Sequence, residues 1–358
     1  MKEKKDFKVV ECSGTFYEIG KQYGTACRDN LVSSIDSLFR DIGMVRKANK
    51  EEIIATARKL LPLVESFDPE LIEMLKGQAE GAGVTFDEVF ALRCKLELGI
   101  YYQRIMALCT SFAATGEATR GGKTIIGQTY DLTPGITIDL VKTRFADSME
   151  QLSLVFAGGG AGELPLNSAG LGMTLNVMLS PIQEQLLNVP CACVIPKAMR
   201  QKRIGDALGV VCAAGRSILY YGFASAEGDI IGIETKPDDY NVIQPERDML
   251  VHANHFLTDR FKKGELIGMA GRACSYIRGQ RLNRLMEKHY GELTVELMKE
   301  FLTDHNNYPN SICGHINEEI PPQGRGQTLA AVIMVPEDRV IHATYGQPCQ
   351  FEYTEYGL

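Results

Sequence analysis

The hydrophobic residues of this chain change their spacing within "ALCTSFAATGEATRGGKTIIGQTYDL", residues 107–132. Before this stretch they recur at the spacing of amphipathic helices, and after it they alternate as they do in strands. Helices in one part of a chain and strands in another favour an α+β fold, in which helices pack against sheets. The change falls at a Cys-Thr-Ser triplet that begins at Cys109.

The part of the chain before the change is predicted to be mainly helical. Helical spacing covers residues 14–43, 49–67 and 88–103, after a short candidate strand at residues 7–12. Asp68 followed by Pro69 predicts the start of a helix, and Gly81 and Gly83 predict its end. Thr85 begins a capping box with a glutamate three residues later, which predicts the start of the next helix.

After the change, strands predominate. Alternating or apolar runs predict strands at residues 109–115, 123–132, 140–146, 151–158 and 170–179, a hairpin at 217–235, a strand at 249–256 and a strand pair at 328–346. Helical spacing is predicted near residues 195–214, 273–289 and 294–304. Two groups of strands with helices between them are typical of a layered α+β sandwich.

Composition excludes several classes of function. A chain of 358 residues, 45% of them hydrophobic, can bury a large core. Its net charge of -7 and its sequence pI of 5.5 argue against a nucleic-acid partner or an anionic membrane surface, which need clustered Lys and Arg. The sequence has neither a signal peptide nor an apolar run of about 18 residues. We therefore expect a cytoplasmic protein without a membrane partner.

The ten cysteines are spread over the chain without a CxxC pair, and the six histidines form no HExxH motif. This pattern predicts neither a disulfide framework nor a metal site, and we expect no cofactor. Most of the cysteines are expected to be small buried hydrophobic residues, namely Cys27, Cys94, Cys191, Cys193, Cys212, Cys274, Cys313 and Cys349.

Cys109 is a candidate nucleophile because of its place in the chain. A catalytic thiol needs a base, and no histidine stands out as its partner. An amino-terminal cysteine carries its own base, because an α-amine has a pKa of about 7.7–8.0 and can accept the thiol proton. Cleavage of the Leu108–Cys109 bond would expose such an amine. The GxSxG motif of α/β-hydrolases is absent from the sequence.

The chain resembles the isopenicillin N acyltransferase-like family, peptidase family C45, of the N-terminal nucleophile hydrolases. The resemblance extends over nearly the whole chain, in the order "GTFYEIGKQYG", "CTS", "GQTYDL", "LNSAGLGMTLNVML", "VHANHFL", "NNYPNSIC" and "GRGQTLAAVIMVPEDR". It implies a four-layer αββα sandwich preceded by a mainly helical segment. It also implies self-cleavage into residues 1–108 and 109–358, which remain one compact unit.

The resemblance implies a role for each matching residue. Cys109 is the nucleophile released by cleavage after Leu108, and Asp131 of "GQTYDL" holds its new amino group. The side-chain amide of Asn254 donates to the oxyanion. Arg325 of "GRGQTL" makes a bidentate contact with Asp131 or with substrate.

Four further residues are expected to line the site. Thr110, Ser111 and Gln128 belong to the matching motifs around the nucleophile. Asn176 corresponds to a pocket asparagine of related bile-salt hydrolases. No metal ligand is implied.

The expected activity is hydrolysis of acyl amides, or acyl transfer to amines, through a Cys109 thioester. The expected partners are a small N-acyl amide or acyl thioester substrate and the cleaved segment 1–108, and a homo-oligomer is left open. One alternative is a choloylglycine or penicillin V acylase-like hydrolase, which uses the same terminal cysteine without needing a long helical segment before it. Another is an uncleaved, catalytically silent scaffold that acts as a binding protein.

Overall fold

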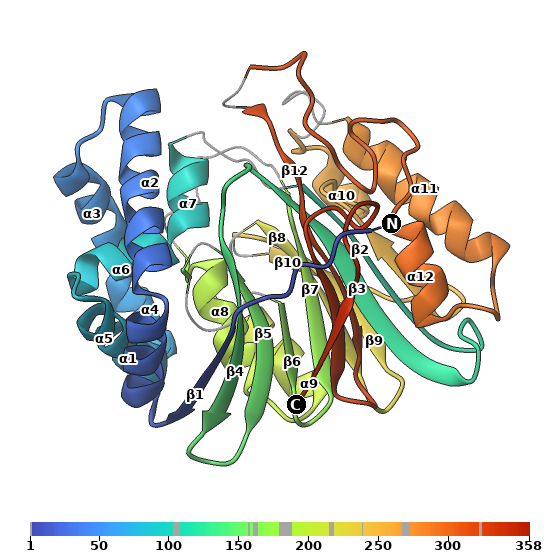
Figure 1. Ribbon diagram of the computed structural model, residues 1–358, viewed down its shortest axis with the longest axis horizontal. Coiled ribbons are helices and arrows are strands. Elements are labelled where there is room, and N and C mark those ends of the chain that lie inside the picture. Colours follow the sequence, from blue (N-terminus) through green and yellow to red (C-terminus); the bar gives the residue numbers. More distant parts are fainter. Residues whose placement is uncertain are drawn as a thin grey trace.

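The computed structural model describes residues 2–102, 108–156, 158–159, 164–178, 188–214, 218–237, 239–266, 273–321 and 324–358. Two sheets form its centre (Figure 1). The larger described sheet has eight strands in the order β1-β4-β5-β6-β7-β8-β9-β10. These strands are β1 (Val9–Gly14), β4 (Ile138–Phe145), β5 (Glu150–Phe156), β6 (Leu164–Asn167), β7 (Leu171–Val177), β8 (Leu219–Ser225), β9 (Ile230–Lys236) and β10 (Asp239–Ile243).

The smaller described sheet has six strands in the order β11-β2-β3-β12-β13-β14. They are β2 (Leu108–Gly116), β3 (Gly122–Leu132), β11 (Met249–His252), β12 (Gln327–Val335), β13 (Val340–Tyr345) and β14 (Thr354–Gly357). The two sheets face each other, because β2 and β3 of the smaller sheet contact β7 and β8 of the larger one. Apart from the parallel pair β1–β4, the described strand pairings are antiparallel.

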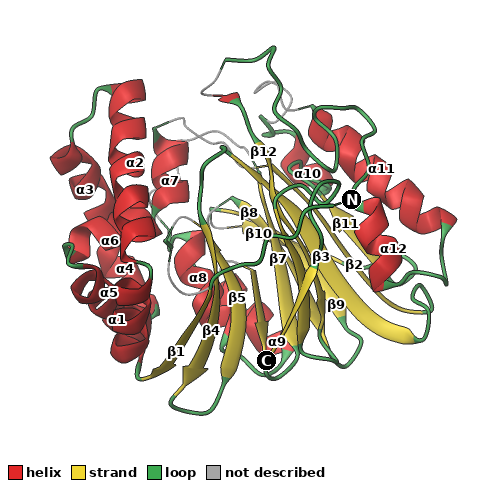
Figure 2. Ribbon diagram, in the orientation of Figure 1, coloured by secondary structure: helices red, strands yellow, loops and turns green. Residues whose placement is uncertain are grey.

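Helices cover the outer faces of both sheets (Figure 2). Helices α8 (Cys191–Met199) and α9 (Ile204–Ala213) pack on strands of the larger sheet. Helices α11 (Cys274–Lys288) and α12 (Val295–Phe301) pack on the smaller one, and the short α10 (Asp259–Lys262) lies near them. The layers therefore follow the order αββα, as predicted.

The amino-terminal part of the chain forms a group of helices beside this sandwich, on the left of Figure 1. They are α1 (Phe16–Ala26), α2 (Arg28–Arg46), α3 (Lys50–Arg58), α4 (Leu61–Phe67), α5 (Pro69–Ala82), α6 (Phe86–Arg93) and α7 (Lys95–Tyr101). Two predicted starts are confirmed, since Asp68 caps α5 and Thr85 forms a capping box at α6. The single helix predicted through residue 103 is two helices, α6 and α7, divided at Cys94; α7 ends at Tyr101, and residue 103 lies outside the described residues.

Glycines allow α1 and α5 to pack with their backbones in contact. A Cβ atom on Gly20 would lie 1.9 Å from the carbonyl oxygen of Met74, and one on Gly77 would lie 2.0 Å from that of Tyr17. Of the two glycines predicted to end the helix, Gly81 lies within α5 and faces α1. The helix ends instead at Gly83, whose positive φ of 71° suits a residue without a side chain.

Other differences from the predicted elements are small. The helical block expected at residues 195–214 is two helices, α8 and α9. The strand expected at 249–256 stops at His252, and the residues after it turn toward β2. The short strands β6, β10 and β14 were not predicted, because four or five residues carry too little periodicity to separate a strand from a loop.

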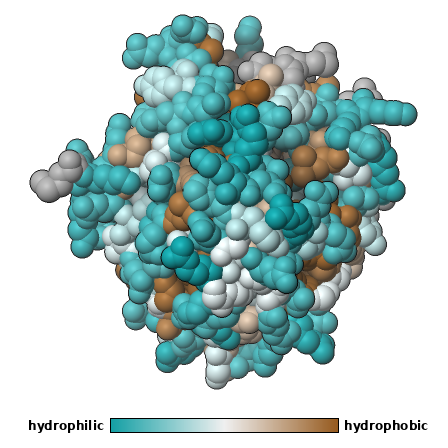
Figure 3. Space-filling model, turned by 90° about the vertical axis from the view of Figure 1, so that its right-hand side faces the viewer, coloured by the Kyte–Doolittle hydropathy of each residue, from teal (hydrophilic) through white to brown (hydrophobic). Residues whose placement is uncertain are grey.

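The surface is mostly hydrophilic on the face drawn in Figure 3, where apolar side chains appear in separate small groups. None of the described helices combines the length and the apolar character that a bilayer-crossing segment requires.

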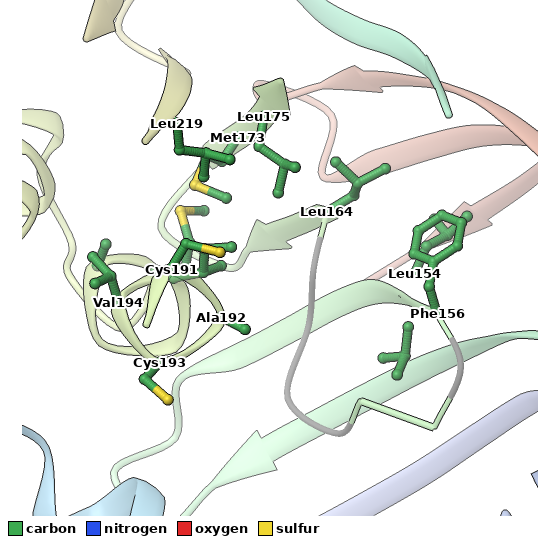
Figure 4. Close-up of a cluster of buried hydrophobic side chains, with 14 of the residues drawn as sticks. Leu154, Phe156, Leu164, Met173, Leu175, Cys191, Ala192, Cys193, Val194 and Leu219 are labelled. Atoms are coloured by element: carbon green, nitrogen blue, oxygen red, sulfur yellow. The ribbon is translucent and has the colours of Figure 1, made fainter. Parts of the chain in front are cut away.

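A large apolar core fills the space under α8 (Figure 4). Cys191 of α8 lies beside Met173 and Leu175 of β7, and Cys193 is fully buried. This confirms the prediction that both are small core residues. Of the other cysteines in that prediction, Cys27, Cys94 and Cys313 are also buried, whereas Cys212, Cys274 and Cys349 are partly exposed.

Candidate active site

Strand register brings the ends of three strands together around Cys109. In the pairing of β2 with β3, Leu108 lies opposite Asp131 and Cys109 opposite Tyr130. In the pairing of β3 with β12, Asp131 lies opposite Thr328. The Thr328 hydroxyl donates to Asp131 Oδ1 at 2.6 Å and accepts from the backbone N–H of Gly314 at 2.8 Å. The candidate nucleophile and the candidate carboxylate thus share one end of the smaller sheet.

Successive side chains of β2 point to opposite faces of the smaller sheet, so its polar residues lie on both faces. Ser111 points toward the facing sheet, where its hydroxyl donates to Asn176 Oδ1 of β7 at 2.6 Å. Thr110 points the other way, and its hydroxyl accepts a hydrogen bond from Arg278 of α11. Cys109 shares the side of Ser111, and its thiol lies near the Asn176 side-chain amide. Both sheets and one outer helix therefore contribute to the site.

Asn254 holds the main chain of Cys109. Its Oδ1 accepts from the backbone nitrogen of Cys109 at 2.8 Å and from Arg278 Nη2 at 2.9 Å. Its Nδ2 donates to the carbonyl of Val177 at 2.9 Å. Two donors on one side and an acceptor on the other fix the orientation of the amide. The oxygen of Asn254, rather than the nitrogen, therefore faces Cys109.

Arg278 is the buried cation of the site and was missed by the sequence analysis. Its side chain is only 2% exposed, and Nη1 donates to the carbonyl of Cys109 at 2.7 Å. In the sequence it is one of three arginines on an amphipathic helix, with Arg281 and Arg284, and no local signal distinguishes it. Only the packing of α11 against β2 places this arginine beside Cys109.

The predicted contact between Arg325 and Asp131 differs from what the structure shows. The guanidinium of Arg325 donates to the carbonyls of Ile320 and Glu318 in its own loop, at 3.0 and 2.8 Å. Arg278 is instead the arginine whose charge acts on Asp131. The backbone carbonyls of a Gly-rich loop can accept the hydrogen bonds of an arginine in the same loop. The sequence motif does not reveal such contacts.

Gln128 connects the two sheets. Its Oε1 accepts from the backbone N–H of Leu175 on β7 at 2.8 Å, and the side chain is fully buried. It therefore positions β7, which carries Asn176, relative to β3. This contact identifies Gln128 as a support of the site.

Burial governs the protonation of both ionisable candidates. It raises the pKa of the Cys109 thiol far above its usual value, and the nearby Asp131 carboxylate adds to the increase. Arg278, the backbone N–H of Asp131 and the Asn176 amide act in the opposite direction. Burial also raises the pKa of Asp131 to about 6, although Arg278 and the Thr328 hydroxyl partly oppose it. In the uncleaved chain the thiol is therefore protonated at neutral pH.

A cavity of about 270 Å³ opens beside the Leu108–Cys109 bond. Leu108, Asp131 and Arg278 line it together with the loop that follows α12, including His315. Cys109 itself is fully buried beneath this wall. A second cavity, of about 580 Å³, lies beside His252 and His255 and does not include Cys109 in its lining.

Two histidines, the buried His252 and the partly exposed His255, support the asparagines. His252 lies between Glu234 and Asn176, with Nε2 3.0 Å from Glu234 Oε1 and Nδ1 3.2 Å from Asn176 Oδ1. His255 lies 2.8 Å from the Ser275 hydroxyl, which accepts from the backbone nitrogen of Asn254 at 2.8 Å. Burial lowers the pKa of His255 to about 3, so this ring is neutral.

Among the described residues, the His, Cys, Asp and Glu side chains close enough together to bind a metal ion are His305, Cys313, His315 and Cys349. They do not include Cys109 or Asp131.

A family model described as "Acyl-coenzyme A:6-aminopenicillanic acid acyl-transferase" matches residues 118–350. The chain is also similar to the "Acyl-coenzyme A:6-aminopenicillanic-acid-acyltransferase 40 kDa form" of Emericella nidulans. The two are 22% identical over 343 residues, which cover 95% of this chain and 92% of the relative.

Two solved structures also resemble this one. The N-acylethanolamine-hydrolyzing acid amidase ortholog of Caenorhabditis elegans has a TM-score of 0.46 and 17% identity, covering 70% of this chain and 100% of its own. A mutant conjugated bile acid hydrolase of Clostridium perfringens has a TM-score of 0.42 and 11% identity, covering 70% of this chain and 97% of its own.

Proposed function

Because the chain belongs to the acyl-coenzyme A:6-aminopenicillanic acid acyl-transferase family, we propose that it is a self-processing enzyme that transfers acyl groups through Cys109. Family membership makes the chain an enzyme of acyl transfer or amide hydrolysis. The proposal depends above all on the surroundings of Cys109. Its main-chain nitrogen lies against Asn254 Oδ1, its thiol lies near the Asn176 amide, and the preceding residue lines a cavity.

Self-cleavage begins at the Leu108–Cys109 bond. The Cys109 sulfur attacks the Leu108 carbonyl carbon, the thiol proton passes to the departing Cys109 nitrogen, and the C–N bond breaks. Water then hydrolyses the Leu108 thioester and leaves a free thiol and a free amine on Cys109. Residues 1–108 and 109–358 become two chains of one molecule.

The new amine serves as the base of the mature enzyme. Its reference pKa of about 7.7–8.0 allows it to take the thiol proton and return it to a leaving amine. Asn254 Oδ1 already accepts from this nitrogen as a peptide N–H, and we expect it to accept from the amine in the same way. The Asp131 carboxylate favours the protonated amine.

Asn176 is our candidate oxyanion donor. Asn254 was assigned this role from the sequence, but its Nδ2 already donates to Val177. The Nδ2 atom of Asn176 has no hydrogen-bond partner among the described residues, although it is buried. The Asn176 amide is also near the Cys109 sulfur, where a tetrahedral intermediate forms. A buried donor without a partner is well suited to a charge that appears only during reaction.

Leu108 marks the acyl side of the site. In the uncleaved chain its carbonyl is the first acyl group that Cys109 accepts, so its side chain lies where the acyl part of a later substrate would lie. The cavity of about 270 Å³ beside it suits a small acyl group. Arg278 and Asp131 on the same wall orient the polar amide or thioester link.

The substrate class follows from this chemistry. The name of the Emericella nidulans relative combines an acyl thioester donor with an amine acceptor. We propose an acyl amide or acyl thioester as donor and water or an amine as acceptor. Arg325 contributes by holding the loop ahead of β12.

Mass spectrometry and activity assays of Cys109 variants test the proposal. Wild-type protein should give fragments of about 12 and 27 kDa, at roughly 110 Da per residue. Cys109→Ala should abolish both cleavage and turnover of N-acyl substrates, and Cys109→Ser should cleave more slowly because a hydroxyl is a weaker nucleophile. Cys212→Ser, which changes a partly exposed cysteine on α9, is the matched control and should behave as wild type.

Turnover by the Cys109→Ala variant would exclude the mechanism. A wild-type chain that remains at 39.5 kDa and turns over no acyl donor would identify an uncleaved scaffold instead.

A further inference from the structure

Four potential metal ligands lie close together beside the cavity of about 270 Å³ that Leu108 lines, here called the catalytic cavity. His305, Cys313 and His315 come from the segment between α12 and β12, and Cys349 follows β13. One ligand atom of each residue lies within 4.8 Å of the others. Cys313 is buried, His315 and Cys349 are partly buried, and His305 is exposed, so an ion can reach the group from solvent.

Four of the distances between these atoms are close to those of a tetrahedral zinc site, and the distances from His305 Nε2 to the two sulfurs are at most 4.8 Å. The two histidine Nε2 atoms are 3.1 Å apart, and the two sulfurs are 3.5 Å apart. His315 Nε2 lies 3.7 Å from the sulfur of Cys313 and 3.4 Å from that of Cys349. With Zn–S bonds of about 2.3 Å and Zn–N bonds of about 2.05 Å, a regular tetrahedron needs about 3.3 Å between nitrogens, 3.6 Å between nitrogen and sulfur, and 3.8 Å between sulfurs.

We propose that His305, Cys313, His315 and Cys349 form a structural zinc site. Two thiolates and two imidazoles are a ligand set that selects Zn²⁺ over Mg²⁺ or Ca²⁺, which prefer oxygen. Four protein ligands close the coordination shell, which is typical of a structural site rather than a catalytic one. Binding displaces one proton from each thiol, so the two thiolates neutralise the charge of the ion.

The surrounding chain orients these ligands. The Asp304 carboxylate forms a salt bridge with Arg281 at 2.6 Å. The backbone carbonyl of Asp304 accepts a hydrogen bond from the backbone nitrogen of Cys313 at 3.1 Å. These bonds hold the residues next to His305 and Cys313 before any ion binds. The backbone N–H of Cys349 also donates to the Cys313 sulfur, a contact that stabilises a thiolate.

A disulfide between Cys313 and Cys349 is the competing explanation. It would use the two sulfurs, which are 3.5 Å apart, well beyond the roughly 2.05 Å of an S–S bond. A disulfide would not explain why the Nε2 atoms of two histidines point at the same place as the sulfurs. The ligand geometry therefore favours metal binding.

The zinc site would brace the wall of the catalytic cavity. Gly314, between two of the ligands, donates its backbone N–H to the Thr328 hydroxyl, which in turn donates to Asp131. His315 itself lines the cavity. This consequence rests on the proposed function, whereas the metal site does not, because its tests measure metal rather than turnover.

Metal analysis of the full chain, purified under reducing conditions without chelator, tests the site. Native mass spectrometry and elemental analysis should find about one zinc ion per chain. The Cys313→Ser/Cys349→Ser variant should retain less than about a tenth of that amount, because it lacks both thiolates. Cys212→Ser, which removes a cysteine far from the group in the sequence, is the control and should keep its zinc.

Cobalt titration of the metal-free wild type tests the site without any variant, so the result does not depend on whether a variant folds. Tetrahedral Co²⁺ with thiolate ligands should give a sulfur-to-cobalt charge-transfer band, which zinc should then remove. Absence of the band in fully reduced protein would overturn the proposal. So would a Cys313–Cys349 disulfide in a freshly purified chain that takes up no metal after reduction.

Discussion

At the scale of single residues, the carboxyl group of Asp131 is buried in the candidate site, and this burial disfavours its charged form. Asp131 is only 6% exposed, and its carboxyl accepts a hydrogen bond from Thr328. Burial nevertheless raises its pKa from 3.8 to about 6, despite Arg278 nearby. The folded chain therefore holds this proton more tightly than the unfolded chain between those two pH values. Asp131 thus lowers the stability of the fold at neutral pH.

We predict that Asp131→Asn changes how stability depends on pH. In the parent protein, the free energy of unfolding contains a contribution from Asp131 that falls as pH rises from about 4 to about 6, because the folded state binds the extra proton in that window. The variant lacks this fall. Relative to its parent, it should gain up to roughly 3 kcal/mol between pH 4 and pH 7.

Urea unfolding at a series of pH values measures this difference. Both proteins should carry Cys109→Ala, which keeps the chain uncleaved. Asp36→Asn, at an exposed position of α2, controls for the general effect of removing a negative charge. If the difference in the free energy of unfolding between the Asp131→Asn protein and its parent stays constant from about pH 4 to about pH 7, Asp131 does not titrate as described.

At the scale of the elements, the contact between α1 and α5 depends on the absence of side chains. Gly20 and Gly24 of α1 face α5, and Gly77 and Gly81 of α5 face α1. At each position a Cβ atom would lie 1.9–2.3 Å from a backbone oxygen of the other helix. Backbone cannot move aside as a side-chain tip can, so these glycines set the distance between the two helices.

We predict that Gly20→Ala destabilises the protein by about 1–3 kcal/mol or more, because the added methyl group forces the two helices apart. Gly209→Ala is the matched control on another helix, α9, where an added Cβ would have no atom within 4 Å. The control should stabilise the helix by roughly 0.5–1 kcal/mol. The shift in the midpoint of urea unfolding measures both effects, and equal shifts would contradict the close contact.

At the scale of the whole molecule, the segment before Cys109 is built into the fold. Strand β1 of this segment pairs in parallel with β4, from Val9 opposite Leu140 to Gly14 opposite Phe145. Buried residues of the amino-terminal helices belong to the same apolar cluster as those of the larger sheet. Cleavage before Cys109 would break one covalent bond and leave these contacts in place.

We therefore predict that the two fragments remain associated after self-cleavage. Size-exclusion chromatography in native buffer should give one peak containing both, because separation would expose the edge of β4 and a large apolar surface. Urea should release them together with the loss of structure. Free 12 kDa fragment in native buffer, at roughly 110 Da per residue, would contradict the prediction.

Local sequence signals predicted most of the longer helices and strands and pointed to Cys109 as the nucleophile candidate. Capping of α5 by Asp68 and of α6 by Thr85 involves atoms only three residues apart, so such signals can be recognised in the sequence. The same is true of strand alternation around Cys109. The αββα layers followed from the order of helices and strands together with the family resemblance.

The family resemblance placed Asn254 near Cys109, but the contacts that the side chains make follow only from the fold. Asn254 and Arg278 reach Cys109 from 145 and 169 residues away, and Cys349 reaches Cys313 from 36 residues away. Nothing in the residues around Arg278 distinguishes it from Arg281, and no ligand spacing connects Cys349 with Cys313. Local patterns arise from forces that act within a few residues, whereas a site depends on how layers and strand register bring distant segments into contact.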